Sequence, residues 1–327
     1  MEVKNNLEGC PICGHQTYIL FSAPCDYRKP IKSELYEVYW CDVCDYGQVW
    51  ERPTKEKVSS FYELDSYYTH QDSAINVGKL EEKVSFFDKL RTHVSWRIDR
   101  GEDLMPHDAM SLLQGDSLTI LEIGCGSGGN LLKFIEKGFS ATGVEPDPEA
   151  RKASKKAGLN VFDGTAEELP KVILNSKYDV VLMSHVLEHC LDVNTAISNV
   201  KSILKTNGVF IVETPNCMSH GFKDYKAAWP WSDIPRHLNF FTNSSLNSIL
   251  SKHGFNVIST KYRGFCRQFS NSWLKNEEEI WHSFKTCSAD VNSKPNFKLR
   301  AWKLLLKSMF SSKTYKYDSI RLIAKNI

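Results

Sequence analysis

Residues 121–128, Leu121-Glu122-Ile123-Gly124-Cys125-Gly126-Ser127-Gly128, decide the fold class of this chain. They close a short apolar run at 118–123 and precede a segment with helical character at 130–137. Glycine at alternate positions permits positive φ angles and lets a ligand approach bare backbone, while the start of the helix offers free N–H groups. This order of strand, glycine loop and helix is typical of a site for a nucleotide-like cofactor.

Short apolar runs alternate with helical segments after this loop. A helix is expected at 147–157, and the pattern predicts strands at 142–145, 160–162, 178–183, 208–213, 254–259 and 318–324. Such alternation predicts a parallel sheet wrapped by helices. Ligands of open parallel sheets bind beyond the carboxyl ends of the strands, so we expect the site at the loops that follow them.

Two acidic residues indicate which cofactor this loop would take. Glu122 lies inside the first strand, and Glu145 ends the second, where a carboxylate can accept both hydroxyls of a ribose. A pyrophosphate site would avoid the charge of Glu122. A cofactor that carries an ammonium and a sulfonium would be attracted by it.

These residues resemble the class I S-adenosylmethionine-dependent methyltransferases over about 105–265 and the last strand. The motifs that agree in order are 121–128, 143–145, 178–181 with 185–189, and 204–208, where the family usually has Leu-Lys-Pro-Gly-Gly. The resemblance implies an α/β fold with a Rossmann-like, seven-stranded methyltransferase sheet. Its sixth strand would be 254–259, its antiparallel seventh 318–324, and a helical insert would occupy about 266–312.

The same resemblance assigns parts of S-adenosyl-L-methionine to residues. Glu122 and the glycine loop would hold the methionine moiety, Glu145 the ribose, and the stretch 164–170 the adenine. The family commonly has Asp where this chain has Thr165, so the Thr165 hydroxyl or Asp163 would replace that contact. The expected cofactor-binding set is Glu122, Gly124, Cys125, Gly126, Gly128, Glu145, Pro146, Thr165, Ala166, Ser184 and His185.

The N-terminal part carries two Cys-x-x-Cys pairs, Cys10 with Cys13 and Cys41 with Cys44, separated by 27 residues. Four thiolates at this spacing close a tetrahedral shell around Zn²⁺ with no open position, which is typical of a structural metal. A redox motif needs only one such pair, so zinc is the favoured interpretation. Cys25 is an alternative ligand.

The expected domain organisation is a zinc ribbon at 1–60, a helical connector at 61–112 and a methyltransferase domain at 113–327. Residues 67–70, Tyr-Tyr-Thr-His, would edge a ligand pocket or, as we favour, pack in an aromatic core. Within the insert, 294–313 is basic and amphipathic. It would contact an anionic or membrane-borne substrate or, as we favour, form a helix that buries its apolar side.

Histidines cluster in the loops after the fourth and fifth strands. We predict His237 as the base that removes a substrate proton, because it follows Pro235 and Arg236 in a turn between aromatic stretches; capping of the following helix is the equal alternative. His185 and His189 are also catalytic candidates. A second metal site at these two is conceivable, but packing against the cofactor is favoured because no further ligands are spaced to help. Arg236 would pair with a substrate phosphate or carboxylate.

The composition narrows the class of substrate. The formal net charge is +2, which argues against a protein that binds nucleic acid through its phosphates. The first residues do not resemble a signal peptide, and no apolar run is long enough for a membrane span. We therefore expect a cytoplasmic protein. The zinc pairs and the 235–238 turn resemble, more weakly, bacterial sugar- and glycan-modifying methyltransferases. Because the chain lacks the Tyr-x-His-Glu-His segment of the C-methylating group, we favour O-methylation of a small or carrier-linked substrate, at an oxygen of a sugar or another hydroxylated metabolite.

Three alternatives to this function stay open. They are a sugar C-methyltransferase, a zinc-ribbon RNA methyltransferase, and a cofactor-binding partner protein without turnover. Against the second stands the lack of an Asn-Pro-Pro-Tyr-like segment after the fourth strand, as well as the low net charge. A homodimer is also left open by the sequence.

Overall fold

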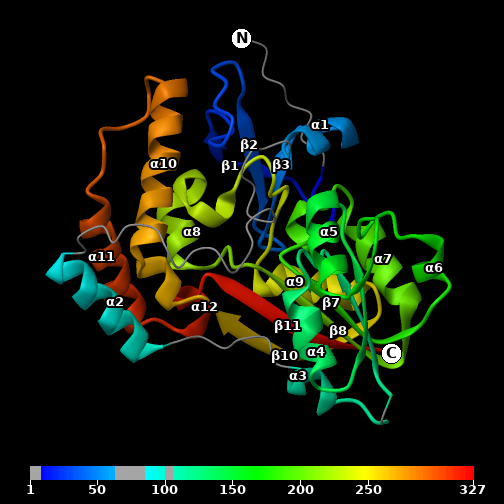
Figure 1. Cartoon of the computed structure of the whole chain (residues 1–327). Helices are drawn as coiled ribbons and strands as arrows, with labels where there is room; N and C mark the ends of the chain where they lie inside the picture. The colour runs from blue at the N-terminus through cyan, green and yellow to red at the C-terminus, as the bar shows by residue number, and fades with distance from the viewer. Residues whose placement is uncertain (1–8, 63–84, 100–105, 116) are drawn as a thin grey trace.

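The structure is a computed structural model that describes residues 9–62, 85–99, 106–115 and 117–327 (Figure 1). The described residues build two sheets and the helices that cover them. The expectation for residues 67–70 lies outside the described residues.

The large sheet has seven strands in the order β10-β11-β8-β7-β4-β5-β6. The five strands β4 to β8 run parallel, and β11 is antiparallel to both of its neighbours. The strands are β4 Thr119–Ile123, β5 Ser140–Val144, β6 Asn160–Phe162, β7 Tyr178–Ser184, β8 Leu204–Pro215, β10 Phe255–Arg263 and β11 Ser319–Asn326. This confirms the expected seven-stranded α/β sheet with an antiparallel last strand.

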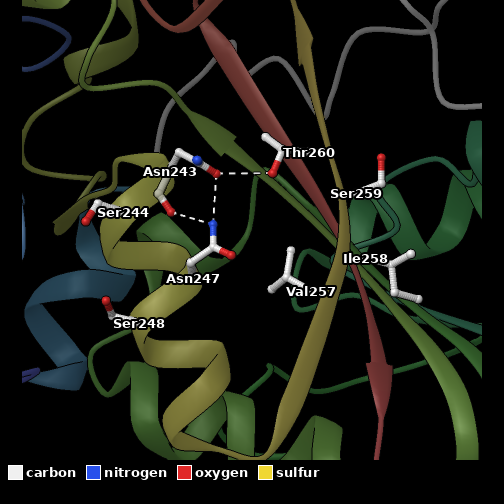
Figure 2. A pocket seen from close by; sticks show the side chains of 8 residues that line it. All are labelled: Asn243, Ser244, Asn247, Ser248, Val257, Ile258, Ser259 and Thr260. Atoms are coloured by element: carbon white, nitrogen blue, oxygen red, sulfur yellow. Dashed lines mark hydrogen bonds between the residues drawn. The ribbon is translucent and has the colours of Figure 1, made fainter.

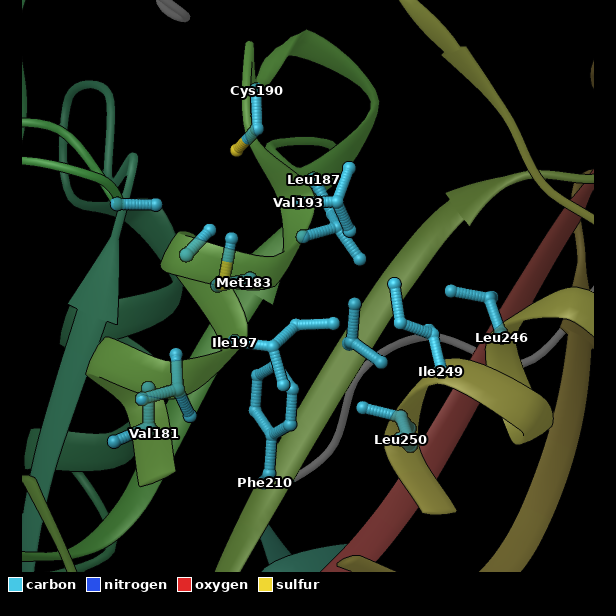
Figure 3. Close-up of a cluster of buried hydrophobic side chains, with 14 of the residues drawn as sticks. Val181, Met183, Leu187, Cys190, Val193, Ile197, Phe210, Leu246, Ile249 and Leu250 are labelled. Atoms are coloured by element: carbon cyan, nitrogen blue, oxygen red, sulfur yellow. The ribbon is translucent and has the colours of Figure 1, made fainter. Parts of the chain in front are cut away.

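Alternate residues of the central strands face opposite sides of the large sheet. Ile120 and Leu182 belong to a core closed by Phe134 of α4, and Leu121 and Val181 belong to a core on the other face. Figure 3 shows part of this second core, where side chains of α7 and α9 meet those of β7 and β8. Because both faces are buried, the strands read as continuous apolar runs in the sequence.

Helices of the large domain begin at polar caps that the sequence supplies. Asp147 caps α5 (Pro148–Lys156), Asp192 caps α7 (Val193–Ile203), and Thr242 caps α9 (Asn243–Lys252) by accepting backbone N–H groups. The other helices are α1 Lys55–Ser60, α2 Phe86–Ile98, α3 His107–Met110, α4 Gly129–Ile135, α6 Lys171–Leu174, α8 His220–Tyr225, α10 Asn271–Cys287, α11 Phe297–Met309 and α12 Lys313–Lys316, with 3-10 turns at Leu187–His189, Lys226–Ala228, Pro230–Ser232 and Cys266–Phe269.

The small antiparallel sheet joins the N-terminal segment to the large domain. It contains β1 Tyr18–Ala23, β2 Tyr36–Cys41 and β3 Tyr46–Trp50, and its fourth strand is β9 Asn239–Phe240, from the loop after β8. In Figure 1 the blue strands therefore lie against the yellow segment that precedes α9. The N-terminal sheet is completed by a segment nearly 190 residues further along the chain.

The segment between β10 and β11 is helical. Residues Phe297, Ala301, Leu304 and Leu305 of α11 are buried, while Lys298 forms an ion pair with Asp88 of α2. Figure 1 shows α2, α10 and α11 grouped at one side of the molecule. The favoured interpretation of the basic amphipathic stretch, a helix with a buried apolar side and a charged outer side, is confirmed.

None of the helices among the described residues has the length and apolar character required to cross a bilayer.

Candidate functional site

The glycine loop adopts positive φ angles, which glycine permits and other residues rarely adopt. Gly124, Gly126 and Gly128 have φ angles of 70°, 52° and 87°. A Cβ at Gly124 would lie 2.4 Å from Cγ2 of Val186, and one at Gly128 would lie 2.1 Å from Cδ1 of Leu159. At Gly126 a Cβ would have no neighbour within 4 Å, so the outer side of the loop is open to a ligand.

Glu145 holds the glycine loop from the next strand. Its Oε2 accepts the N–H of Gly126 at 2.7 Å, and its Oε1 accepts the N–H of Asp147 at 2.9 Å. Burial raises the pKa of this carboxyl. Each oxygen keeps a lone pair for a further donor, so Glu145 can accept two ligand hydroxyls without giving up these bonds.

Glu122 is buried beneath the same loop with one oxygen unsatisfied. Asn130 of α4 donates to its Oε1 at 2.8 Å, while its Oε2 is buried without a partner. Burial, assisted by the charge of Glu145, raises the pKa of Glu122 to about 8. A buried carboxylate oxygen without a donor is costly, and a ligand ammonium group would satisfy it.

Other residues of the expected cofactor set lie around the loop in varied roles. The thiol of Cys125 is buried and packs over Gly143. The carbonyl of Pro146 accepts from Arg151 at 2.6 Å, and Thr165 Oγ1 accepts the N–H of Glu168 at 3.0 Å.

The two alternatives for the adenine contact differ in exposure. Asp163 is mostly exposed and forms an ion pair with Arg151. Thr165 is half-buried, and its neighbour Ala166 is fully buried. Of the two, Thr165 therefore lies closer to the protein interior.

Ser184 is the last residue of β7, and His185 follows it. Strand β7 lies beside β4, the strand that leads into the glycine loop. His185 has a φ of 57°, unusual for a residue with a Cβ, and its ring stacks on Trp231 at a centroid distance of 5.1 Å. Its Nδ1 donates to Glu188 Oε1 at 3.1 Å, and its Nε2 lies 3.4 Å from Glu213 Oε1. Although burial opposes the charged ring, these carboxylates raise the pKa of His185 to about 9. His185 is therefore a proton donor at neutral pH and a poor base.

His189 and His237 lie together, with ring centroids 4.6 Å apart. Nδ1 of His237 lies 2.8 Å from the carbonyl oxygen of Trp231, and Nδ1 of His189 lies 3.0 Å from that of Arg236. A carbonyl only accepts, so both rings carry the proton on Nδ1 and present a bare Nε2. Burial and the proximity of His189 lower the pKa of His237 to about 4.

The turn that carries His237 differs from its expected form. It is buried, and the capping alternative for His237 is wrong because Thr242 caps α9. The expected substrate contact of Arg236 is wrong as well. Arg236 donates through both terminal nitrogens to Asp26, at 2.8 and 2.7 Å, and through Nε to Asp233 at 3.0 Å. The positive charge of Arg236 is therefore paired with carboxylates inside the protein.

The N-terminal sheet also supports the histidine pair through Asn239 of β9. Tyr46 donates to Asn239 Oδ1 at 2.6 Å, and Arg52 donates to the same oxygen. The amide nitrogen of Asn239 donates to the carbonyl of Cys190 at 2.7 Å and contacts that of Glu188 at 3.2 Å. The turn that carries Glu188 and His189 is thus fixed by residues of β3 and the loop after it.

The four cysteines Cys10, Cys13, Cys41 and Cys44 meet at one point. Their Sγ atoms approach within 3.5 Å (Cys10 and Cys44), 3.6 Å (Cys13 and Cys41), 3.7 Å (Cys41 and Cys44) and 2.9 Å (Cys13 and Cys44). Zinc–sulfur bonds of about 2.3 Å give a tetrahedron with edges of about 3.8 Å, so the cluster fits a zinc ion with a small expansion. Cys25 lies in another core, where its thiol faces the carbonyl of Ser283.

An open groove of about 500 Å³ lies elsewhere, between α9 and β10 (Figure 2). Its lining is neutral and consists of Asn243, Ser244, Asn247, Ser248, Val257, Ile258, Ser259 and Thr260. None of the expected site residues contributes to it. With no titratable side chain in its lining, the groove lacks the groups that proton transfer requires.

Sequence reasoning assigned no role to three residues that shape the site. Glu188 is one of the candidates in the loop after the fourth strand, and its position between His185 and His189 is the available signal. Asn239 and Asp26 had no local signal, because their roles depend on the contact between the N-terminal sheet and the large domain.

A comparison with protein families matches residues 98–260 to a model described as a methyltransferase domain. The match covers the glycine loop, both buried acids and the histidine cluster. This segment is therefore similar to methyltransferase domains, the class that the motifs indicated.

Curated relatives are similar to a little under half of the chain. The ubiquinone biosynthesis O-methyltransferase of Azorhizobium caulinodans is 32% identical over 46% of this chain and 64% of its own length, and that of Rickettsia canadensis is 28% identical over 44% and 65%. The chain thus spans less than two thirds of these relatives. A SAM dependent methyltransferase from Archaeoglobus fulgidus is similar in structure over 72% of this chain and 94% of its own, with 20% identity and a TM-score of 0.46.

Proposed function

We propose that this protein transfers a methyl group from S-adenosyl-L-methionine to an oxygen of a small or carrier-linked hydroxylated metabolite. The observation that carries the proposal is the pair of buried acids beside the open glycine loop. Glu122 has an oxygen without a partner, and Glu145 has two oxygens with spare acceptor capacity. This donor-poor, carboxylate-rich arrangement fits a ribonucleoside that carries an amino-acid group and does not fit a pyrophosphate.

The residues divide the binding task as follows. Glu122 holds the ammonium group, the open backbone at Gly126 receives the amino-acid part, and Glu145 accepts the ribose hydroxyls. Pro146, Thr165 and Ala166 lie on the adenine side, and Ser184 and His185 face the reacting end. S-adenosyl-L-methionine supplies a methyl group already activated by a sulfonium, so the protein must only align the acceptor and remove its proton.

His237 is placed for that removal. Its Nδ1–H is fixed on the Trp231 carbonyl, so its bare Nε2 can take the hydroxyl proton as the O–CH₃ bond forms and the C–S bond breaks. His189 lies beside it, and His185, already protonated, orients Glu188. The lowered pKa of His237 keeps the ring neutral at neutral pH and also makes it a weaker proton acceptor than an ordinary histidine.

The names of the relatives support oxygen as the acceptor atom, since both are described as O-methyltransferases. They do not support the weaker resemblance to sugar-modifying enzymes. Of the two acceptor classes expected from the sequence, we therefore propose the more general one, a small hydroxylated metabolite, and not a sugar in particular.

We also propose that the four-cysteine cluster holds one structural Zn²⁺. Four ligands fill the shell, so the ion has no open position for chemistry. Its function is to fix the small sheet that β9 completes.

Calorimetric titration with S-adenosylhomocysteine tests the cofactor site. We expect micromolar binding to the original chain and roughly 100-fold weaker binding to Glu145→Ala, because two charge-assisted hydrogen bonds are lost. Glu149→Ala, at an exposed acid in the first turn of α5, is the matched control and should bind within about threefold. Absence of binding to folded, zinc-loaded protein would favour a partner protein without turnover.

Transfer of a labelled methyl group to a panel of hydroxylated acceptors then tests the reaction. With an accepted substrate, His237→Ala should lower kcat about 100-fold while the affinity for S-adenosylhomocysteine stays within about threefold. An unchanged kcat in this variant would contradict the role of His237.

A further inference from the structure

We propose that Glu188, His189 and His237 form a second metal site, which binds a divalent transition-metal ion and leaves it open to a substrate oxygen. The sequence argument found too few ligands here, because it considered His185 with His189 alone. The structure supplies the others. One ligand atom from each of Glu188, His189 and His237 lies within 4.8 Å of the others.

Both imidazoles are prepared as ligands. Each directs Nδ1 toward a backbone carbonyl, which fixes the tautomer and leaves Nε2 without a proton. This is the support that ligating histidines usually have in metal sites. The hydroxyl oxygen of Tyr62 lies 2.9 Å from the same Nδ1 of His189, so the Nδ1–H can be shared between this oxygen and the carbonyl of Arg236.

The carboxylate is the independent indication of a missing cation. Glu188 is fully buried, and its Oε1 is engaged by His185 while its Oε2 has no partner. An unpartnered buried oxygen next to two bare imidazole nitrogens leaves three acceptors with no donor among them. A cation satisfies all three at once.

The donor set indicates the class of ion. One carboxylate and two imidazoles suit Zn²⁺, Mn²⁺, Fe²⁺ or Co²⁺, and three protein ligands leave at least one position open. This distinguishes the site from the closed, all-thiolate cluster at Cys10, Cys13, Cys41 and Cys44. His189 is half-buried, whereas Glu188 and His237 are buried, so His189 lies on the outer side of the site.

The catalytic role of this ion rests on the proposed function, although its binding does not. With the ion bound, Nε2 of His237 is a ligand and no longer the base. Held by Glu188, His189 and His237, the ion would lower the pKa of a substrate hydroxyl and so would favour loss of its proton before methyl transfer. His237 thus acts as the base when the ion is absent and as a metal ligand when the ion is bound.

Titration of the zinc-loaded full chain with Mn²⁺, followed by the EPR signal of the free ion, tests this site. Mn²⁺ binds poorly to thiolates, so the filled cysteine cluster does not interfere. We expect about one Mn²⁺ per chain, and at least tenfold weaker binding in Glu188→Gln and in His237→Gln. His253→Gln is the matched control. His253 directly follows α9 and contacts Asn194 and Ser198, so the Mn²⁺ affinity of this variant should equal that of the original chain.

Titration of each variant with S-adenosylhomocysteine shows that it is folded. Equal Mn²⁺ binding by the original chain and by His237→Gln, or no binding by the original chain at millimolar Mn²⁺, would overturn the metal site and leave His237 as the base. Mn²⁺ binding at these residues in a chain without affinity for S-adenosylhomocysteine would instead retain the metal site and overturn the proposed function.

Discussion

The glycine loop and the histidine cluster lie at neighbouring strand ends, yet they are built in opposite ways. The loop, both buried acids and their supporting residues come from one continuous stretch, 119–147, in which the contacts are mostly local. The histidine cluster joins residues 185–189 to 231–239 and depends on the N-terminal sheet through Asn239 and Asp26. One site is a property of a strand–loop–helix unit, and the other is a property of the assembled molecule.

This difference separates binding from turnover. A perturbation of the N-terminal sheet should reach the histidine cluster and spare the cofactor loop. A perturbation of the buried acids should do the reverse.

Removal of zinc should have the largest effect. A strong chelator should unfold the ribbon strands, so that β9 loses its pairing with β3 and Asn239 loses Tyr46 as a donor. We expect methyl transfer to fall more than 100-fold and S-adenosylhomocysteine affinity to change less than about threefold. Zinc should restore turnover, whereas Mn²⁺ added alone should not. Simultaneous loss of binding and turnover would show that the loop also depends on the ribbon.

Asp26→Asn should have the next largest effect. It removes one carboxylate from the buried guanidinium of Arg236 and leaves that charge with Asp233. Breaking a buried ion pair costs about 3 kcal/mol, which chemical denaturation would measure as a lower free energy of unfolding. Glu34→Gln, at a more exposed acid of the same segment that pairs with Lys57, is the control and should cost less than about 1 kcal/mol. A similar loss in both variants would argue against the role of the buried pair.

The same contrast explains what sequence reasoning predicted. Short-range patterns predicted the order of strands, the glycine loop, Glu122, Glu145 and the cysteine pairs. In each of these patterns the spacing of residues along the chain is enough to indicate their role. The buried state of Arg236 does not, because its partner Asp26 lies 210 positions earlier in the chain. A polar turn between aromatic stretches resembles an exposed substrate loop until that partner is in place.

Glu122 should give cofactor binding a proton-linked pH dependence. Below a pH of about 8 this carboxyl is protonated in the free protein, because burial raises its pKa. Pairing with an ammonium group favours the ionised form, so binding releases a proton and affinity increases with pH until the pKa is passed. Between pH 6 and pH 7 we expect S-adenosylhomocysteine affinity to increase about tenfold.

Glu122→Gln isolates this effect. Its affinity should be lower at pH 7 and nearly constant between pH 6 and pH 7, and calorimetry in buffers of different ionisation enthalpy should detect no released proton. A slope that persists in Glu122→Gln would assign the proton to another group, such as Glu145, whose pKa is also raised by burial.

The smallest effect should come from Thr165→Asp, which tests the adenine side of the loop. Thr165 Oγ1 accepts the N–H of Glu168, and an Asp at this position can accept the same donor while offering a second oxygen to an adenine amino group. Because Asp163, Glu167 and Glu168 already surround the position, their repulsion should offset part of the gain. We expect S-adenosylhomocysteine to bind about threefold more tightly, and S-inosylhomocysteine, which lacks the amino group, to gain nothing. Equal gains for both ligands would show that the added charge acts on the loop and not on the adenine, so the cofactor unit would be less local than its continuous sequence suggests.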